Sequence, residues 1–115
     1  MNTITVYGIS NCDIIKKTLD WYKKKNIAVD FHDYKKEGIS PEKITGWCRE
    51  AGWERLLNKK STTWRGLPLE EQQKITNEQK AITLMMEYPT IIKRPVVEIN
   101  NKIIVGFNET YFTKQ

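Results

Sequence analysis

The chain of 115 residues is poor in cysteine and histidine. It contains two cysteines, Cys12 and Cys48, and one histidine, His32. Two cysteines are too few for the disulfide scaffold of a small secreted protein. A structural zinc site usually has four His or Cys ligands, which this sequence cannot supply. We therefore expect neither a disulfide framework nor a bound metal.

Long apolar runs and export signals are also missing from the sequence. No segment approaches the ~20 apolar residues of a membrane-spanning helix. The first ten residues, MNTITVYGIS, lack the basic and apolar regions of a signal peptide. No repeat, low-complexity tract or flexible linker interrupts the chain. We expect a single domain, residues 1–115, in the cytoplasm and without a membrane partner.

The formal net charge is +5, and the basic residues are spread along the chain. A basic surface favours anionic partners such as a carboxylate, an oxyanion or nucleic acid. A solvated surface that keeps a protein soluble gives the same composition. Charge alone does not distinguish these alternatives.

The first third of the chain has the pattern of a strand, a helix and a second strand. Residues 3–7 (TITVY) are β-branched and aromatic, and residues 28–34 alternate apolar with polar side chains. Between them, residues 12–25 have one apolar face, with Asn11 as N-cap and Asn26 in the left-handed position after the helix. This order predicts a right-handed crossover and a parallel pair of strands.

The rest of the chain predicts helices followed by a hairpin. The expected elements are a helix from Ser40-Pro41 to Gly52, short helices within residues 53–57 and 69–88, a loop at 59–68, a hairpin at 96–105 that turns at Asn100-Asn101, and a terminal helix at 108–114.

Cys12 is the main candidate for chemistry. It lies between a predicted strand and the start of a helix, where free N–H groups and the helix dipole favour a thiolate. The alternative is a buried, inert cysteine. Cys48 lies in the apolar stripe of its helix, so it is expected to pack in the core or, less simply, to act as a resolving thiol. A C-x-x-C motif is absent, because Ile15 stands where the second cysteine of the motif would be.

Two further polar residues, Arg94 and His32, are considered as site residues. Arg94 directly precedes Pro95 at the start of the predicted hairpin. Its planar fork can hold a carboxylate or an oxyanion, although a plain surface arginine is an equal alternative. His32 is expected to be a solvated residue on the polar face of its strand.

Seven short segments together resemble the ArsC/Spx family of thioredoxin-like proteins, and in particular its YffB-like branch. These segments are residues 6–13 (VYGISNCD), 15–17 (IKK), 31–34 (FHDY), 52–54 (GWE), 56–58 (LLN), 62–65 (TTWR) and 91–95 (IIKRP). The resemblance covers the whole chain. It implies an α/β, thioredoxin-like fold with the order βαβ, a helical insert at about residues 40–90, then ββα, around a mixed four-stranded sheet.

The resemblance also implies a site. Cys12 would be the nucleophile, Pro95 the cis-proline facing it, and Arg94 the arginine that arsenate reductases use on the oxyanion. We expect Asn11 and Arg65 to complete the substrate-binding residues, with no metal.

The sequence departs from the arsenate reductases of this family at three positions. Gly8 replaces a histidine before the cysteine, while Asn58 and Gly106 replace two arginines that bind the oxyanion. With one arginine of three, arsenate is expected to be a poor substrate unless Arg65 or Lys60 compensates.

The expected function is that of a glutathione-dependent reductase with one reactive thiol, in which glutathione is the co-substrate. The chain would act as a monomer. The alternative is an Spx-like regulatory protein that binds RNA polymerase without catalytic turnover. Spx-type regulators typically sense oxidation through a C-x-x-C motif, and its absence weakens this alternative.

Overall fold

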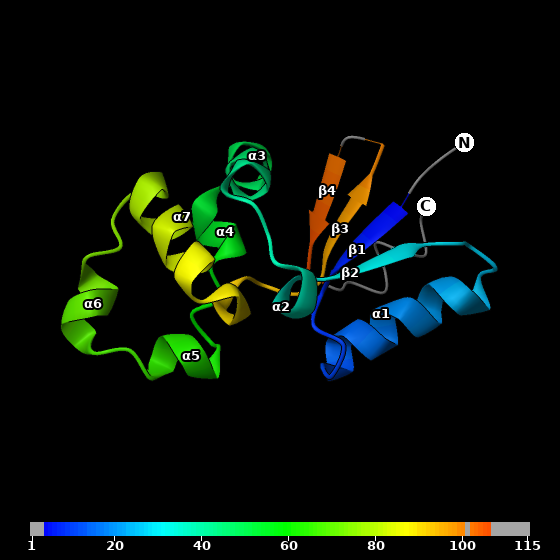
Figure 1. The fold of residues 1–115 in the computed structure, drawn as a ribbon, viewed down its shortest axis with the longest axis horizontal. Coiled ribbons are helices and arrows are strands. Elements are labelled where there is room, and N and C mark those ends of the chain that lie inside the picture. Colours follow the sequence, from blue (N-terminus) through cyan, green and yellow to red (C-terminus); the bar gives the residue numbers. More distant parts are fainter. Residues whose placement is uncertain (1–3, 101, 107–115) are drawn as a thin grey trace. The chain divides into compact units, whose positions relative to one another are not determined.

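The computed structural model describes residues 4–100 and 102–106. Along these residues the elements are β1 (Ile4–Gly8), α1 (Asp13–Lys24), β2 (Asp30–Asp33), α2 (Tyr34–Glu37), α3 (Pro41–Ala51), α4 (Trp53–Leu56), α5 (Thr62–Arg65), α6 (Leu69–Gln73), α7 (Glu78–Glu87), the 3-10 helix η1 (Pro89–Ile91), β3 (Val96–Ile99) and β4 (Lys102–Val105) (Figure 1).

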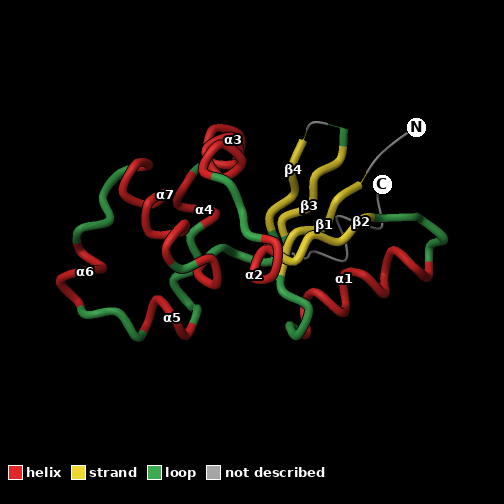
Figure 2. Tube along the Cα trace, viewed as in Figure 1, coloured by secondary structure: helices red, strands yellow, loops and turns green. Residues whose placement is uncertain are grey.

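The described residues divide into two compact units. The first holds the residues up to Asp33 and those from Arg94 onward, and the second is Tyr34–Lys93. The strands and α1 belong to the first unit, whereas the second is helical (Figure 2). The predicted insert, residues 40–90, falls within the second unit. That both units act as one domain stays a prediction.

The strands of the first unit form one sheet in the order β2-β1-β3-β4. β1 pairs in parallel with β2 and antiparallel with β3, and β3 pairs antiparallel with β4. The predicted mixed four-stranded sheet and its parallel pair are thus confirmed. The strand β1 lies between β2 and β3. The loop that follows β1 is therefore flanked by the end of β2 and the start of β3.

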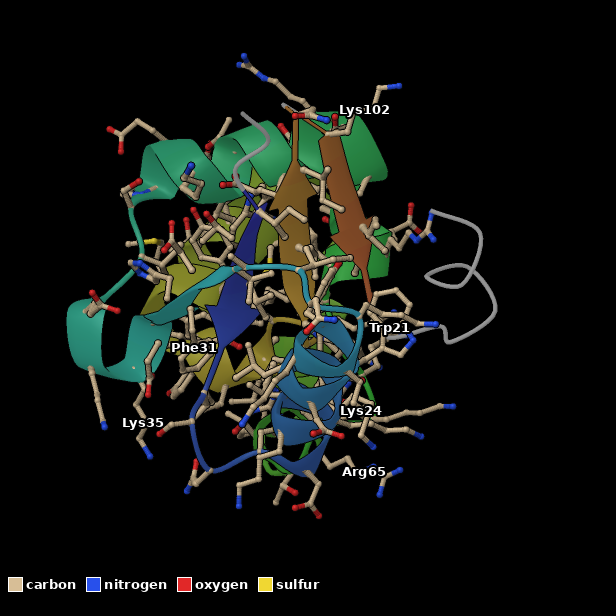
Figure 3. The ribbon with its side chains drawn as sticks, turned by 90° about the vertical axis from the view of Figure 1, so that its right-hand side faces the viewer. Trp21, Lys24, Phe31, Lys35, Arg65 and Lys102 are labelled. Carbon is tan, nitrogen blue, oxygen red and sulfur yellow. The ribbon has the colours of Figure 1, made fainter. Side chains whose placement is uncertain are left out.

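The helix α1 covers one face of the sheet. Alternate residues of a strand point to opposite faces, and the side chains of Val6 and Val97 on this face are fully buried with Tyr22 of α1. Hydrophobic residues that are partly buried pack around these three: Ile4, Leu19, Trp21, Val29, Phe31, Ile99 and Ile104. Figure 3 labels two α1 residues, Trp21 of this cluster and the exposed Lys24.

The opposite face of the sheet carries polar side chains next to the fully buried Val96, which pairs with Tyr7. The hydroxyl of Tyr7 donates a hydrogen bond of 2.7 Å to Glu98, and the rings of Tyr7 and His32 lie 5.0 Å apart. Burial, and after it the hydrogen bond and charge of Glu98, raise the pKa of Tyr7. His32 is half-buried against a ring rather than solvated, because Tyr7 is its partner in the register of β1 and β2.

The start of α1 corrects one prediction. The helix begins at Asp13, and its N-cap is Cys12 rather than Asn11. The end of α1 agrees with the sequence. Asn26 has a φ of 59°, and its N–H donates to the carbonyl of Lys23 at 3.0 Å. The N–H of Ile27 donates to Tyr22 at 3.0 Å, which completes a Schellman motif.

The second unit contains the predicted helix α3, which runs from its N-cap Ser40 to Gly52. The Ser40 hydroxyl accepts the N–H of Lys43 at 3.1 Å, and Gly52 has a φ of 92°. The predicted loop at 59–68 contains the helix α5, because Ser61 caps it by accepting the N–H of Trp64 at 3.1 Å.

Two other boundaries differ from expectation. The strand predicted to reach residue 34 ends at Asp33, because Tyr34 begins the short helix α2. The helical stretch predicted at 69–88 is divided into α6 and α7. No helix within the described ranges has the length and hydropathy needed to cross a membrane.

The predicted hairpin is present as β3 and β4, and Asn100 in its turn has a φ of 50°. Asn101 and the predicted terminal helix at 108–114 lie outside the described residues.

Asn26 provides a test of the α1 terminus. A left-handed backbone costs most residues about 1–2 kcal/mol, whereas glycine adopts it freely. We expect Asn26→Ala to lower the free energy of unfolding by about 1 kcal/mol and Asn26→Gly to leave it nearly unchanged. Urea denaturation measures both, and equal losses in the two variants would contradict this assignment of the helix end.

Candidate functional site

The register of the sheet brings several predicted site residues to one end of the first unit. Gly8, the last residue of β1, pairs with Asp33 at the end of β2, and Tyr7 pairs with Val96 at the start of β3. The loop to Cys12 and the segment Arg94-Pro95 therefore leave and enter the sheet at the same end. We call this the Cys12 end of the sheet.

Cys12 occupies the N-cap of α1 and is half-buried. Its carbonyl accepts the N–H groups of Ile15 at 3.1 Å and Lys16 at 3.0 Å. Within the described part of the chain, its side chain accepts no capping hydrogen bond from the helix. The N–H groups of the first turn and the helix dipole therefore remain available to stabilise an anion here. The exposed Asp13 opposes this effect, and the exposed Lys16 supports it.

Gly8 allows α1 to approach the sheet closely. A Cβ atom at this position would lie 2.6 Å from Cγ1 of Ile15, which is closer than real Cβ contacts. Ile15 is fully buried one turn after Cys12. The space that a histidine at position 8 would need is thus filled by an apolar side chain. This packing gives a physical reason for the departure from the family pattern at Gly8.

The Arg94-Pro95 peptide bond is cis, as the resemblance implied. Pro95 is buried, and its carbonyl accepts the N–H of Gly106 at 2.8 Å. Gly106 has a φ of 85°, a backbone region that favours glycine over the arginine of the family pattern. Arg94 is half-buried, and its guanidinium makes no hydrogen bond or ion pair with the residues that the structure describes. That Pro95 faces Cys12 stays a prediction.

The remaining predicted residues have different locations. Asn11 is exposed in the loop before Cys12. Arg65 is exposed at the end of α5, in the second unit (Figure 3). Asn58 organises a turn there, since its side-chain oxygen accepts the N–H of Lys60 at 3.1 Å. Whether Arg65 or Lys60 contributes to the site stays a prediction.

Cys48 is a core residue of α3, as the sequence predicted, and is 3% exposed. Burial, and after it the negative charge of Glu78, raise the pKa of its thiol to about 11. In the unfolded chain this thiol loses its proton at a lower pH, about 8.5. The protonated Cys48 therefore adds to the free energy of unfolding below that pH, and this contribution is lost as the pH rises toward 11. Both cysteines are free thiols.

Sequence reasoning missed Asp33, which lies at the Cys12 end. The side chain of Asp33 shares the inward face of β2 with Phe31, and its carboxylate accepts the N–H of Ser10 at 3.2 Å. A carboxylate at an inward strand position was the available signal, because such a group needs a donor. Across the described ranges, no three His, Cys, Asp or Glu side chains are grouped so that they could hold a metal ion.

Comparison with known proteins gives consistent matches. The model of the ArsC family matches residues 7–114. An uncharacterized protein of Haemophilus influenzae is 42% identical over 106 residues, which are 92% of each chain. The regulatory protein MgsR of Bacillus subtilis is 27% identical over 91% of this chain and 83% of its own. The global transcriptional regulator Spx 2 of Oceanobacillus iheyensis is 24% identical over 93% of this chain and 78% of its own.

One solved structure supports the fold directly. The YFFB protein is 41% identical and has a TM-score of 0.91, with 97% of both chains covered. The α/β fold with its mixed sheet is therefore that of the thioredoxin-like ArsC structures.

The environments of the two thiols predict different reactivity. We expect iodoacetamide at pH 8 to modify Cys12 at least about tenfold faster than Cys48, because a buried thiol with a raised pKa supplies little thiolate. Rates measured by mass spectrometry on Cys12→Ser and Cys48→Ser separate the two sites. A faster reaction at Cys48 would show that the wrong cysteine has been assigned to the site.

Proposed function

The chain belongs to the ArsC family, and we propose that it is a glutathione-dependent thiol reductase that uses Cys12 as its single nucleophile. One observation carries this proposal. The Cys12 end of the sheet combines a thiol at a helix N-cap, the cis-proline Pro95 and the half-buried cation Arg94. A second cysteine is missing from the turn after Cys12, where the buried Ile15 stands instead.

The chemistry requires two exchanges of a disulfide bond. The Cys12 thiolate attacks the glutathione sulfur of a mixed disulfide, which forms a Cys12–glutathione bond and releases the substrate as a thiol after protonation. A free glutathione thiolate then attacks the glutathione sulfur of this adduct. Oxidised glutathione leaves and the Cys12 thiolate is restored. The net reaction converts the mixed disulfide and one free glutathione into the substrate thiol and oxidised glutathione, so one glutathione thiol is oxidised as the substrate sulfur is reduced.

Arg94 has the chemistry to hold a carboxylate of glutathione. Its guanidinium can donate two parallel hydrogen bonds. The carboxylates of glutathione lie away from the reacting sulfur, so one arginine with backbone donors is enough. Arsenate instead gains charge next to the attacking sulfur and needs several aligned donors. Each missing charge-assisted hydrogen bond is worth about 1.5–3 kcal/mol, so the loss of two arginines weakens arsenate reduction strongly.

A regulatory role is the second candidate. It is favoured by the names of two relatives that match over more than 90% of this chain, a regulatory protein and a global transcriptional regulator. In this role the chain would bind RNA polymerase, and Cys12 would sense oxidation or have no redox function. Such a protein has no need to turn over glutathione disulfides.

Treatment with oxidised glutathione tests the proposal. We expect intact-mass analysis to show one glutathione adduct, located at Cys12 and absent in Cys12→Ser. Cys48→Ala should form the adduct like the wild type. Glutathione should then release the adduct, and a mixed disulfide of glutathione with a small thiol should be reduced catalytically. A loss of two hydrogens without added glutathione would contradict the single-thiol mechanism, and an adduct without turnover would favour the regulatory role.

The contribution of Arg94 is measured in the same assay. Arg94→Ala should weaken the apparent affinity for glutathione by about 10-fold or more, the scale of a charge-assisted hydrogen bond. Arg49→Ala, which removes an exposed arginine on α3, is the matched control and should change little. Rapid arsenate reduction by the wild type, coupled to glutathione and glutaredoxin, would overturn the proposed preference for glutathione.

A further inference from the structure

Asp33 places a buried carboxylate at the Cys12 end of the sheet. The residue is 6% exposed, and its Oδ2 accepts the backbone N–H of Ser10 at 3.2 Å. A carboxylate removed from water is unfavourable unless hydrogen-bond donors face it. The Ser10 N–H is a donor of this kind, and it belongs to the loop that joins β1 to Cys12, although Ser10 itself is exposed.

The register of the parallel strands explains how this side chain reaches the loop. Gly8 and Asp33 are paired at the ends of β1 and β2, and neighbouring strands lie about 4.8 Å apart. Ser10 follows Gly8 by two residues. The hydrogen bond from the Ser10 N–H to the carboxyl group of Asp33 thus attaches the loop to the neighbouring strand.

We infer that Asp33 is a positioning residue for Cys12, because its hydrogen bond to the Ser10 amide fixes the turn that places Cys12 at the N-cap of α1. One residue separates Ser10 from Cys12, so a shift of the loop moves the sulfur relative to the N–H groups of the first turn. Those groups stabilise a thiolate within about one turn of the helix end. The inference rests on the proposed function in one respect, that Cys12 is the reactive thiol.

A buried carboxylate also acts on a thiol through its charge, which disfavours a nearby thiolate. If Asp33 acts by positioning the loop, removing it should slow the reaction of Cys12. If it acts mainly through its negative charge, removing it should make Cys12 react faster. Asp33→Asn separates them, because the amide oxygen still accepts a hydrogen bond but carries no charge. Asp33→Ala removes both properties.

The experiment measures the alkylation rate of Cys12 by iodoacetamide from pH 6 to 9 in a Cys48→Ala background. We expect Asp33→Asn to react like the parent and Asp33→Ala to react about threefold more slowly at pH 7, with its rate profile moved to higher pH. Asp30→Ala, a matched control at the other end of β2 where the side chain is exposed, should react like the parent. Acceleration in both Asp33 variants, or a parental rate in a folded Asp33→Ala, would overturn the inference.

A measurement on the intact protein covers the case in which Asp33→Ala does not fold. In the parent protein, the amide proton of Ser10 should be protected from hydrogen exchange, and its NMR shift should follow the titration of Asp33. Asp33→Asn should keep the protection and abolish the titration. Exchange of the Ser10 amide at the rate of an unstructured peptide would overturn the inference. None of these readouts requires glutathione, so they are independent of whether the glutathione chemistry is correct.

Discussion

The pairing of β1 with a parallel strand on one side and an antiparallel strand on the other is the constraint on which the site depends. Parallel strands end at the same end of a sheet, while an antiparallel partner begins there. The C-terminal end of β1 is thus bordered by the end of β2 and the start of β3. As a result, the cysteine loop, Asp33 and the segment Arg94-Pro95 lie at the same end of the sheet, although they are far apart in the sequence.

The close contact between Gly8 and Ile15 is the second constraint, and it determines which chemistry the site can support. A side chain at position 8 would clash with the buried side chain of Ile15 and would force it to shift. The apolar side chain of Ile15 therefore occupies the space beside position 8 that a histidine would need. A site of this kind stabilises its thiolate through backbone N–H groups and the helix dipole. Thiol exchange can proceed with this support, whereas an oxyanion substrate needs more donors.

Much of the sheet unit could be predicted from local sequence. β-branched strands, the apolar face of α1 and the asparagines at positive φ are short-range signals, and each led to the observed element. The cis bond before Pro95 came from the family resemblance, because no local pattern distinguishes it.

Other features depend on tertiary structure and could not be derived from the sequence in the same way. The N-cap lies at Cys12 instead of Asn11, a difference of one residue that propensities do not resolve. α5 has four residues, too few for a helical periodicity to be visible, although Ser61 followed by Trp64 was a usable signal. The contact of Asp33 with Ser10 spans 23 positions in the sequence and depends on the register that pairs Asp33 with Gly8.

The central claim is that the Cys12 end of the sheet binds glutathione. An NMR titration of the Cys12→Ser variant with reduced glutathione tests it most directly, because binding is then observed without reaction. The account predicts saturable shift changes concentrated in residues 9–13 and 94–96. Shift changes that are absent at millimolar glutathione, or that occur on α1 and β4 away from this end, would contradict it.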